Sequence, residues 1–154
     1  MFNIVLFEPE IPPNTGNIMR LCANTGCTLH LIKPLGFTLD DKRLRRAGLD
    51  YREFSEVHEW DQLSSLLDQF DRERVFAITT KATTHYHQAR FQRDDLLLFG
   101  PETRGLPEQV LDLMPQDRKL RIPMLEHSRS LNLANAASVI VYEAWRQIGF
   151  NEGQ

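Results

Sequence analysis

Short apolar runs separated by polar and glycine-rich segments dominate the hydrophobic pattern of this chain. Residues 3–7 and 95–99 are almost wholly apolar, which is typical of strands buried on both faces of a sheet. Residues 8–13 contain three prolines and predict a loop. Further strands are predicted at residues 28–32, 74–79 and 119–122, with a weaker one at 54–57 and a polar loop at 80–88.

Helical spacing of apolar residues separates several of these runs. The predicted helices are one from Asn14 to Gly26, a short basic one over residues 40–46 closed by Gly48, and two over 60–70 and 106–114.

A last helix is predicted over residues 132–148, with Ser130 or Asn132 as its N-cap and Gly149 just beyond its end. It carries two apolar stripes, whereas a helix packed on one side needs only one. Deep burial in the chain's own core and a contact with a partner subunit both explain the second stripe. The first stripe is Leu133, Ala137, Ile140 and Ala144, and the second is Ala134, Val141, Trp145 and Ile148.

Alternating strands and helices predict a single α/β domain over residues 1–154, with a mainly parallel sheet and helices on both faces. The pattern alone favours a flavodoxin-like or Rossmann-like layout. Ligands of such sheets bind beyond the carboxyl ends of the strands. Three segments leave strands at that edge with polar or glycine-rich content: 79–81, 100–105 and 123–130.

Composition restricts the location of the protein more than its chemistry. Hydrophobic residues make up 42% of the chain and charged residues 25%, as in an ordinary globular domain. No apolar run approaches the ~20 residues of a membrane span, and the N-terminus lacks the basic segment of a signal peptide. Cys22 and Cys27 have no further cysteine partner, so we expect two buried thiols in a cytoplasmic protein.

Charge is distributed unevenly along the chain. The net charge of −3 does not suggest a nucleic-acid partner, but residues 42–46 read KRLRR. Residues 53–71 then contain six carboxylates and no lysine or arginine. This asymmetry can place a basic patch on a mildly acidic protein, although a solvated helix face explains either run taken alone.

Common catalytic signatures are missing from the sequence. Gly100 and Gly105 have the spacing of a P-loop, but Leu106 stands where its lysine would follow. Neither a dinucleotide-binding glycine motif nor the nucleophile elbow of a serine hydrolase occurs. His85 and His87 lack a nearby third ligand, so we expect them in a surface loop and predict no metal site.

The first predicted helix carries an unusual polar face. Asn17, Arg20 and Asn24 recur on it at spacings of three and four, next to Gly16. An arginine flanked by two asparagines suits phosphate or ribose oxygens. An ion pair between Arg20 and Glu8 is an equally good structural explanation.

Three motifs, in this order, resemble the SPOUT class of RNA methyltransferases. They occupy residues 14–20, 99–106 and 122–135, and the resemblance extends over nearly the whole chain. It implies a deep C-terminal trefoil knot, which nothing in the periodicity indicates. It also implies S-adenosylmethionine as the cofactor, with S-adenosylhomocysteine as the product.

The resemblance also assigns site residues. The cofactor would lie on three loops, held largely by backbone groups of Ile78, Thr79, Gly100, Ile122, Met124, Ser130 and Leu131. The reactive residues would be Asn14, Arg20, Glu102, Ser130 and Asn132.

The implied reaction transfers a methyl group to the ribose 2′-hydroxyl of the wobble nucleotide in tRNA, with leucine tRNAs as the substrates. In related enzymes the counterpart of Arg20 reaches the cofactor of a partner subunit, so a homodimer is expected. The domain would itself grip the anticodon arm. The candidates for phosphate contacts are Lys42, Arg43, Arg45, Arg46, Arg104 and Arg129.

Two other functions are compatible with the sequence. A non-catalytic RNA-binding or ribosome-assembly factor could keep the same fold, although intact Arg20, Glu102 and Asn132 favour the enzyme. The bare α/β pattern also allows a flavodoxin-like redox protein, which would be yellow when purified.

Overall fold

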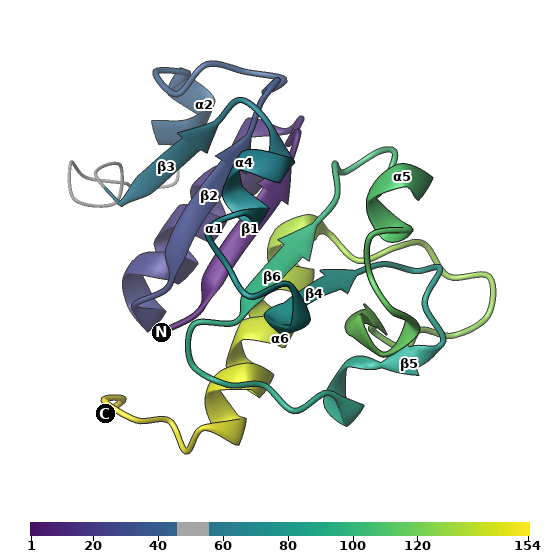
Figure 1. Cartoon of the computed structure of the whole chain (residues 1–154). Coiled ribbons are helices and arrows are strands. Elements are labelled where there is room, and N and C mark those ends of the chain that lie inside the picture. The colour runs from purple at the N-terminus through teal and green to yellow at the C-terminus, as the bar shows by residue number, and fades with distance from the viewer. Residues whose placement is uncertain (46–55) are drawn as a thin grey trace.

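A seven-stranded sheet organises the domain. The computed structural model describes residues 1–45 and 56–154, and the strand order in this part of the chain is β3-β2-β1-β6-β4-β7-β5 (Figure 1). Each pair of neighbouring strands is parallel, which confirms the predicted parallel α/β architecture. The strands are β1 (Asn3–Phe7), β2 (Thr28–Ile32), β3 (Val57–Trp60), β4 (Val75–Ile78), β5 (Thr84–His85), β6 (Leu96–Phe99) and β7 (Lys119–Arg121).

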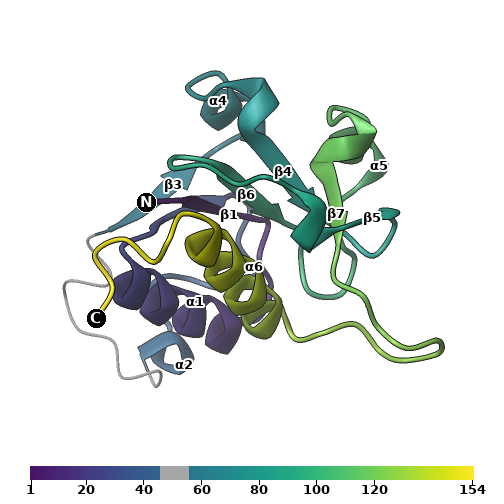
Figure 2. The same cartoon turned by 90° about the horizontal axis from the view of Figure 1, so that it is seen from below.

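Helices cover both faces of this sheet, as predicted. Figure 2 shows α1, α2 and α6 on one face and α4 and α5 on the other. The α-helices are α1 (Pro12–Thr25), α2 (Lys42–Arg45), α4 (Leu63–Leu67), α5 (Glu108–Leu111) and α6 (Leu133–Gln147), with 3₁₀ turns η1 (Arg72–Arg74), η2 (Tyr86–Gln88) and η3 (Gln116–Arg118).

Strand alternation divides the core between the two faces. Ile4 and Leu6 of β1 pack with the residues of α1 and α6, whereas Val5 packs with those of α4 and α5. Successive side chains of a strand point to opposite faces, so a strand covered on both sides must be apolar throughout. This explains the continuous apolar runs of β1 and β6.

Two sequence predictions fail where tertiary contacts override the local pattern. The strand expected over residues 54–57 is β3, Val57–Trp60, and residues 54 and 55 lie outside the described part. Trp60, expected to begin a helix, pairs with Ile32 across the sheet, and its indole N–H donates to Nδ1 of His30 at 3.1 Å. These contacts hold the segment in the sheet, so the following helix begins only at Leu63.

The proline-rich segment also differs from its prediction as a loop, because Pro12 and Pro13 form the first turn of α1. Proline loses nothing there, since the first N–H groups of a helix have no intrahelical partner. The helix ends as predicted at Gly26, whose φ is 74°.

Other boundaries shift in smaller ways. The polar loop predicted over residues 80–88 contains β5 and η2, and the short helices α4 and α5 are shorter than predicted. The basic helix is observed as Lys42–Arg45, while Arg46 and Gly48 lie outside the described residues.

Helix α6 uses both of its apolar stripes within this chain. Ala137 and Ile140 of the first stripe and Ala134 and Val141 of the second are all buried. Trp145 and Ile148 are half-buried and pack against the same core cluster. Burial in the chain's own core therefore accounts for much of the second stripe, and contact of this helix with a partner subunit stays a prediction.

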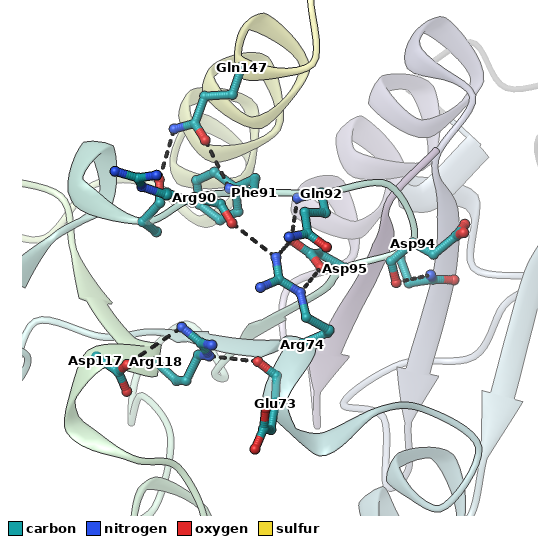
Figure 3. Close-up of polar contacts among 12 residues, drawn as sticks. Glu73, Arg74, Arg90, Phe91, Gln92, Asp94, Asp95, Asp117, Arg118 and Gln147 are labelled. Atoms are coloured by element: carbon teal, nitrogen blue, oxygen red, sulfur yellow. Dashed lines mark hydrogen bonds and ion pairs between the residues drawn. The ribbon is translucent and has the colours of Figure 1, made fainter.

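A buried ion pair fixes the amino-terminal side of β4 and β6 (Figure 3). The Asp95 carboxylate is 1% exposed and accepts from Nε and Nη2 of Arg74, at 2.8 and 2.6 Å. It also accepts from the backbone N–H of Gln92 at 2.7 Å. Gln147 of α6 accepts from the N–H of Phe91 at 2.8 Å, so the last turn of that helix is tied to the same segment.

Replacing Asp95 by Asn should destabilise the protein by about 3–5 kcal/mol, because a largely enclosed arginine loses its compensating charge. Asp94→Asn is the matched control, since that side chain is 85% exposed and Asn accepts its φ of 69°. The control should change the free energy of unfolding by less than about 0.5 kcal/mol. Urea denaturation measures both, and equal losses would contradict this role of the ion pair.

Candidate functional site

A cleft of about 530 Å³ opens at the carboxyl ends of β4, β6 and β7. Three segments line it: residues 78–81, residues 99–106 and parts of 122–136. Ile11 and Asn14, at the start of α1, complete the lining. The three loops that the sequence placed at this edge of the sheet therefore do converge.

All seven residues expected to hold a cofactor line this cleft. They come from strand ends and loops that are far apart in sequence, and the parallel sheet brings these ends to one edge. They are Ile78, Thr79, Gly100, Ile122, Met124, Ser130 and Leu131.

The expected reactive residues divide into two groups. Asn14, Glu102 and Asn132 line the cleft together with Ser130. Arg20 is not among the lining residues of the described part of the chain, and its side chain is half-buried further along α1.

The expected RNA contacts lie mostly outside the cleft. Arg104 lines it, whereas Lys42, Arg43 and Arg129 are exposed elsewhere. Arg46 and the side chain of Arg45 lie outside the described part.

Asn132 connects the two helices that flank the cleft. Its Oδ1 accepts from the N–H groups of Ala134 and Asn135, at 2.9 and 3.3 Å, so Asn132, one of the two predicted candidates, is the N-cap of α6. Its Nδ2 donates to Oδ1 of Asn14 at 2.8 Å. One amide therefore caps α6 and also fixes the orientation of a buried side chain on α1.

Glu102 is held by backbone N–H groups of the segment that leads into α1. Its carboxylate accepts from the N–H of Glu10, at 3.0 Å to Oε1, and from the N–H of Ile11. In return, the Glu10 carboxylate accepts from the N–H and the hydroxyl of Thr103, at 3.0 and 2.8 Å. The N–H of Thr103 is the main cause that lowers the pKa of Glu10. Two carboxylates thus join residues 10–11 to residues 102–103.

Arg104 lies beside the same segment. Its Nη2 is 3.2 Å from a carboxylate oxygen of Glu8, and its Nε is 3.9 Å from one of Glu10. Glu8, which the sequence offered as a partner of Arg20, therefore pairs with Arg104. The guanidinium of Arg104 stays 59% exposed, so it remains accessible to an anionic ligand.

Gly100 is required by the fold of its own loop. A Cβ at this position would lie 2.3 Å from the N of Leu106 and 2.5 Å from the C of Gly105. The loop turns back on itself, with the N–H of Gly105 donating to the carbonyl of Pro101 at 2.9 Å. Any side chain at Gly100 would force this turn open.

Sequence reasoning missed several contributors to the site. Lys81 lines the cleft and pairs with Glu108 at 2.8 Å, a contact that lowers the pKa of Glu108. Its place two residues after Thr79, just beyond a strand end, was a usable signal. Glu10 had only a weak signal, a carboxylate shortly before a predicted helix.

The lining suits a small organic ligand with both flat apolar and polar parts. Phe99, Leu106 and Leu133 are among the apolar residues of the lining, and residues with amide and hydroxyl groups lie among them. Within residues 1–45 and 56–154, no group of three or more His, Cys, Asp or Glu side chains could hold a metal ion. No described helix is both long and apolar enough to cross a membrane.

Comparison with known proteins identifies relatives over nearly the full length. Residues 1–142 match the model of the SpoU rRNA methylase family. The tRNA (cytidine(34)-2′-O)-methyltransferase of Yersinia pestis is 63% identical, with 97% of this chain and 96% of that protein aligned. The Escherichia coli K12 protein of the same name is 59% identical, with coverage of 97% and 96%.

Solved structures share the fold. One, described as giving structural insights into the 2-OH methylation of C/U34 on tRNA, is 47% identical with a TM-score of 0.89, and 98% of each chain is covered. The SpoU methyltransferase AviRb from Streptomyces viridochromogenes, in complex with the cofactor AdoMet, is 27% identical with a TM-score of 0.80. That match covers 99% of this chain and 58% of the AviRb chain.

The dual role of Asn132 can be separated by two substitutions. Asn132→Ser keeps a good N-cap but is too short to reach Asn14, whereas Asn132→Ala loses both contacts. Urea denaturation should therefore show Asn132→Ala to be less stable than Asn132→Ser by about 1 kcal/mol. Equal stabilities would mean that the cap contributes nothing measurable to α6.

Proposed function

The chain belongs to the SpoU methylase family, and from this premise we propose that it methylates the ribose 2′-hydroxyl of nucleotide 34 in tRNA, with S-adenosylmethionine as the methyl donor. Near full-length similarity to tRNA (cytidine(34)-2′-O)-methyltransferases is the observation that carries the proposal. We extend it to leucine tRNAs and to a cytoplasmic enzyme, on the resemblance of the three motifs.

The cleft fits this cofactor in size and chemistry. A cavity of about 530 Å³ lies within the usual range for a small-molecule site. Its apolar walls suit an adenine ring, and backbone groups at the strand ends suit the polar edges of a nucleoside. The seven lining residues named above would hold the cofactor, with Gly100 and Ser130 on different loops. When bound, S-adenosylmethionine supplies a methyl group on a positively charged sulfur, which is the electrophile of the reaction.

The protein must then orient the acceptor ribose and stabilise charge on its 2′ oxygen. Arg20 suits the second task, because a guanidinium keeps its proton and so acts as a cation, not as a general base. It would bind a neighbouring phosphate and the developing oxyanion. The hydroxyl proton would leave to a phosphate oxygen or to water.

The remaining polar residues would position these groups. Asn14 and Asn132 share a hydrogen bond at the cleft and could orient the ribose. The Glu102 carboxylate is occupied by two backbone N–H groups, an arrangement that favours a positioning role over proton transfer.

A homodimer would complete the site. Arg20 is not among the residues that the described part of the chain contributes to its own cleft, so a second copy is the natural source of this cation. Val139 and Tyr142 of α6 are exposed large hydrophobic residues and could lie in the shared surface.

The anticodon arm would then lie across both subunits. Lys42, Arg43, Arg45 and Arg46 would contact phosphates from one side, and Arg104 from the rim of the cleft. Arg129 belongs to the segment between β7 and α6, which extends beyond the body of the domain (Figure 2). These contacts would position the RNA, while unstacked loop bases would carry the specificity.

Mapping of ribose methylation in tRNA from a deletion strain tests the proposed function directly. Methylation at nucleotide 34 should disappear and return when the wild-type chain is supplied. Unchanged methylation in the deletion strain, or a protein that binds tRNA without methylating it, would favour the non-catalytic alternative.

Gly100→Val should weaken S-adenosylmethionine binding at least tenfold, about 1.4 kcal/mol, because the added side chain opens the 100–106 loop. Gly149→Asn is the control, since that position lies beyond α6 with a φ of 80° that Asn tolerates, and it should bind normally. Calorimetry with and without tRNA measures both. Equal affinities in the two variants would remove Gly100 from the cofactor site.

Arg20→Ala should lose methyl transfer but keep cofactor binding, and Arg20→Lys should also be poor because a point charge cannot replace the planar fork.

Arg20→Ala and Gly100→Val proteins, unfolded together and refolded, should regain about a quarter of wild-type activity through mixed dimers with one intact site. Labelled-methyl incorporation and sedimentation are the measurements. Full subunit exchange without activity would refute the shared site, and a monomer would refute the dimer.

A further inference from the structure

We propose that Glu10 is a positioning residue of the methyl-transfer site, an inference that rests on the proposed function. Its carboxylate would hold the 100–106 loop, which lines the cofactor cleft, against the segment that leads into α1. No motif pointed to Glu10, and it does not line the cleft itself.

The first support is the number of hydrogen bonds that meet at this residue. The Glu10 carboxylate receives both the N–H and the hydroxyl of Thr103, and the backbone N–H of Glu10 donates to Glu102. Hydrogen bonds to an ionised carboxylate are roughly twice as strong as neutral ones. Glu10 thus contacts two consecutive residues of the loop through its side chain and its backbone.

The second support is the rigid backing of Glu10. The N–H of Gly36 donates to the carbonyl of Pro9 at 2.9 Å, and a Cβ on Gly36 would lie 2.9 Å from Cα and O of Glu10. The close approach of Gly36 leaves the Glu10 backbone little room to move. A carboxylate on such a support can fix the position of Thr103.

The third support is what the two joined segments carry. The loop contains Gly100, whose tight turn depends on its contact with Gly105 and Leu106. The other segment continues directly into α1, which carries Asn14 and Arg20. Glu10 therefore couples the loop that would hold the cofactor to the helix that would act on the acceptor ribose.

The contact between Glu10 and Arg104 is too weak to account for this role. Nε of Arg104 lies 3.9 Å away and its side chain is 59% exposed, and exposed pairs contribute little. Hydrogen-bond acceptance, more than charge, is what Thr103 requires. Glu10→Gln should therefore preserve the function of the residue, whereas Glu10→Ala should abolish it.

The test compares binding of S-adenosylmethionine, kcat, KM for tRNA and melting temperature. Glu10→Ala should weaken cofactor binding about tenfold and lower kcat, while Glu10→Gln stays within about threefold of wild type. Thr103→Val, which keeps the N–H but loses the hydroxyl, should weaken binding about threefold even if Glu10→Ala does not fold. The double variant Glu10→Ala with Thr103→Val should be no worse than Glu10→Ala alone.

Glu8→Gln is the control, because it removes a carboxylate partner of Arg104 without touching Thr103. Its cofactor affinity should stay within about twofold of wild type. Additive losses in the double variant, a Glu10→Ala protein of normal affinity, or an equal loss in Glu8→Gln would each overturn the inference.

Failure of the proposed function gives a different result. A wild-type protein that binds the cofactor but methylates no tRNA would refute the function and leave the affinity comparison intact. Amide hydrogen exchange at Thr103 needs neither ligand. It should be faster in Glu10→Ala than in wild type, with the strands unchanged, and equal exchange would overturn the positioning role whatever the activity.

Discussion

Reciprocal hydrogen bonding between two carboxylates is the constraint on which the cleft depends. Glu102 accepts from the backbone at Glu10 and Ile11, and Glu10 accepts from Thr103, across sequence separations of 91 to 93 residues. Without these contacts, Glu102 and Thr103 would lose their hydrogen bonds to the segment that leads into α1. With them, one wall of the cleft and the start of α1 are fixed relative to one another.

The two ends of the parallel strands have different roles: contacts at one end stabilise the fold, and the other end carries the candidate site. At the amino-terminal side, the Arg74–Asp95 pair and Gln147 fix the segment before β6 to the strands and to α6. At the carboxyl side, Asn132 and Glu102 hold polar groups around an open cleft. The polar contacts at the carboxyl side also hold side chains beside the cleft, where lone pairs and backbone groups stay available to a ligand.

In the proposed mechanism the protein mainly positions the reactants and supplies few reactive groups. The cofactor would bring the electrophile, so no nucleophile, metal or strongly perturbed acid is required of the cleft. Arg20, which is absent from the cleft lining of the described chain, would come from a second copy of the protein. Such a site would work only when the two subunits and the RNA are correctly placed, which would explain the many positioning contacts around the cleft.

The sequence by itself determined the layers of this fold, because periodicity and caps are local properties. The bounds of β1 and β2 and the parallel sheet follow from apolar runs, and capping residues limited the N-cap of α6 to Ser130 or Asn132. The family resemblance also selected seven expected cofactor residues, and all seven line one cleft. The trefoil knot stays a prediction from family resemblance.

Only the tertiary structure decided how those elements are used. It put Trp60 in a strand because that residue pairs with Ile32, and it assigned both stripes of α6 to the chain's own core. It also showed that Glu8 pairs with Arg104 and that the Glu10 carboxylate accepts a hydrogen bond from Thr103. Contacts between residues so far apart leave no periodic trace in a single sequence, since each depends on where the sheet carries its loops.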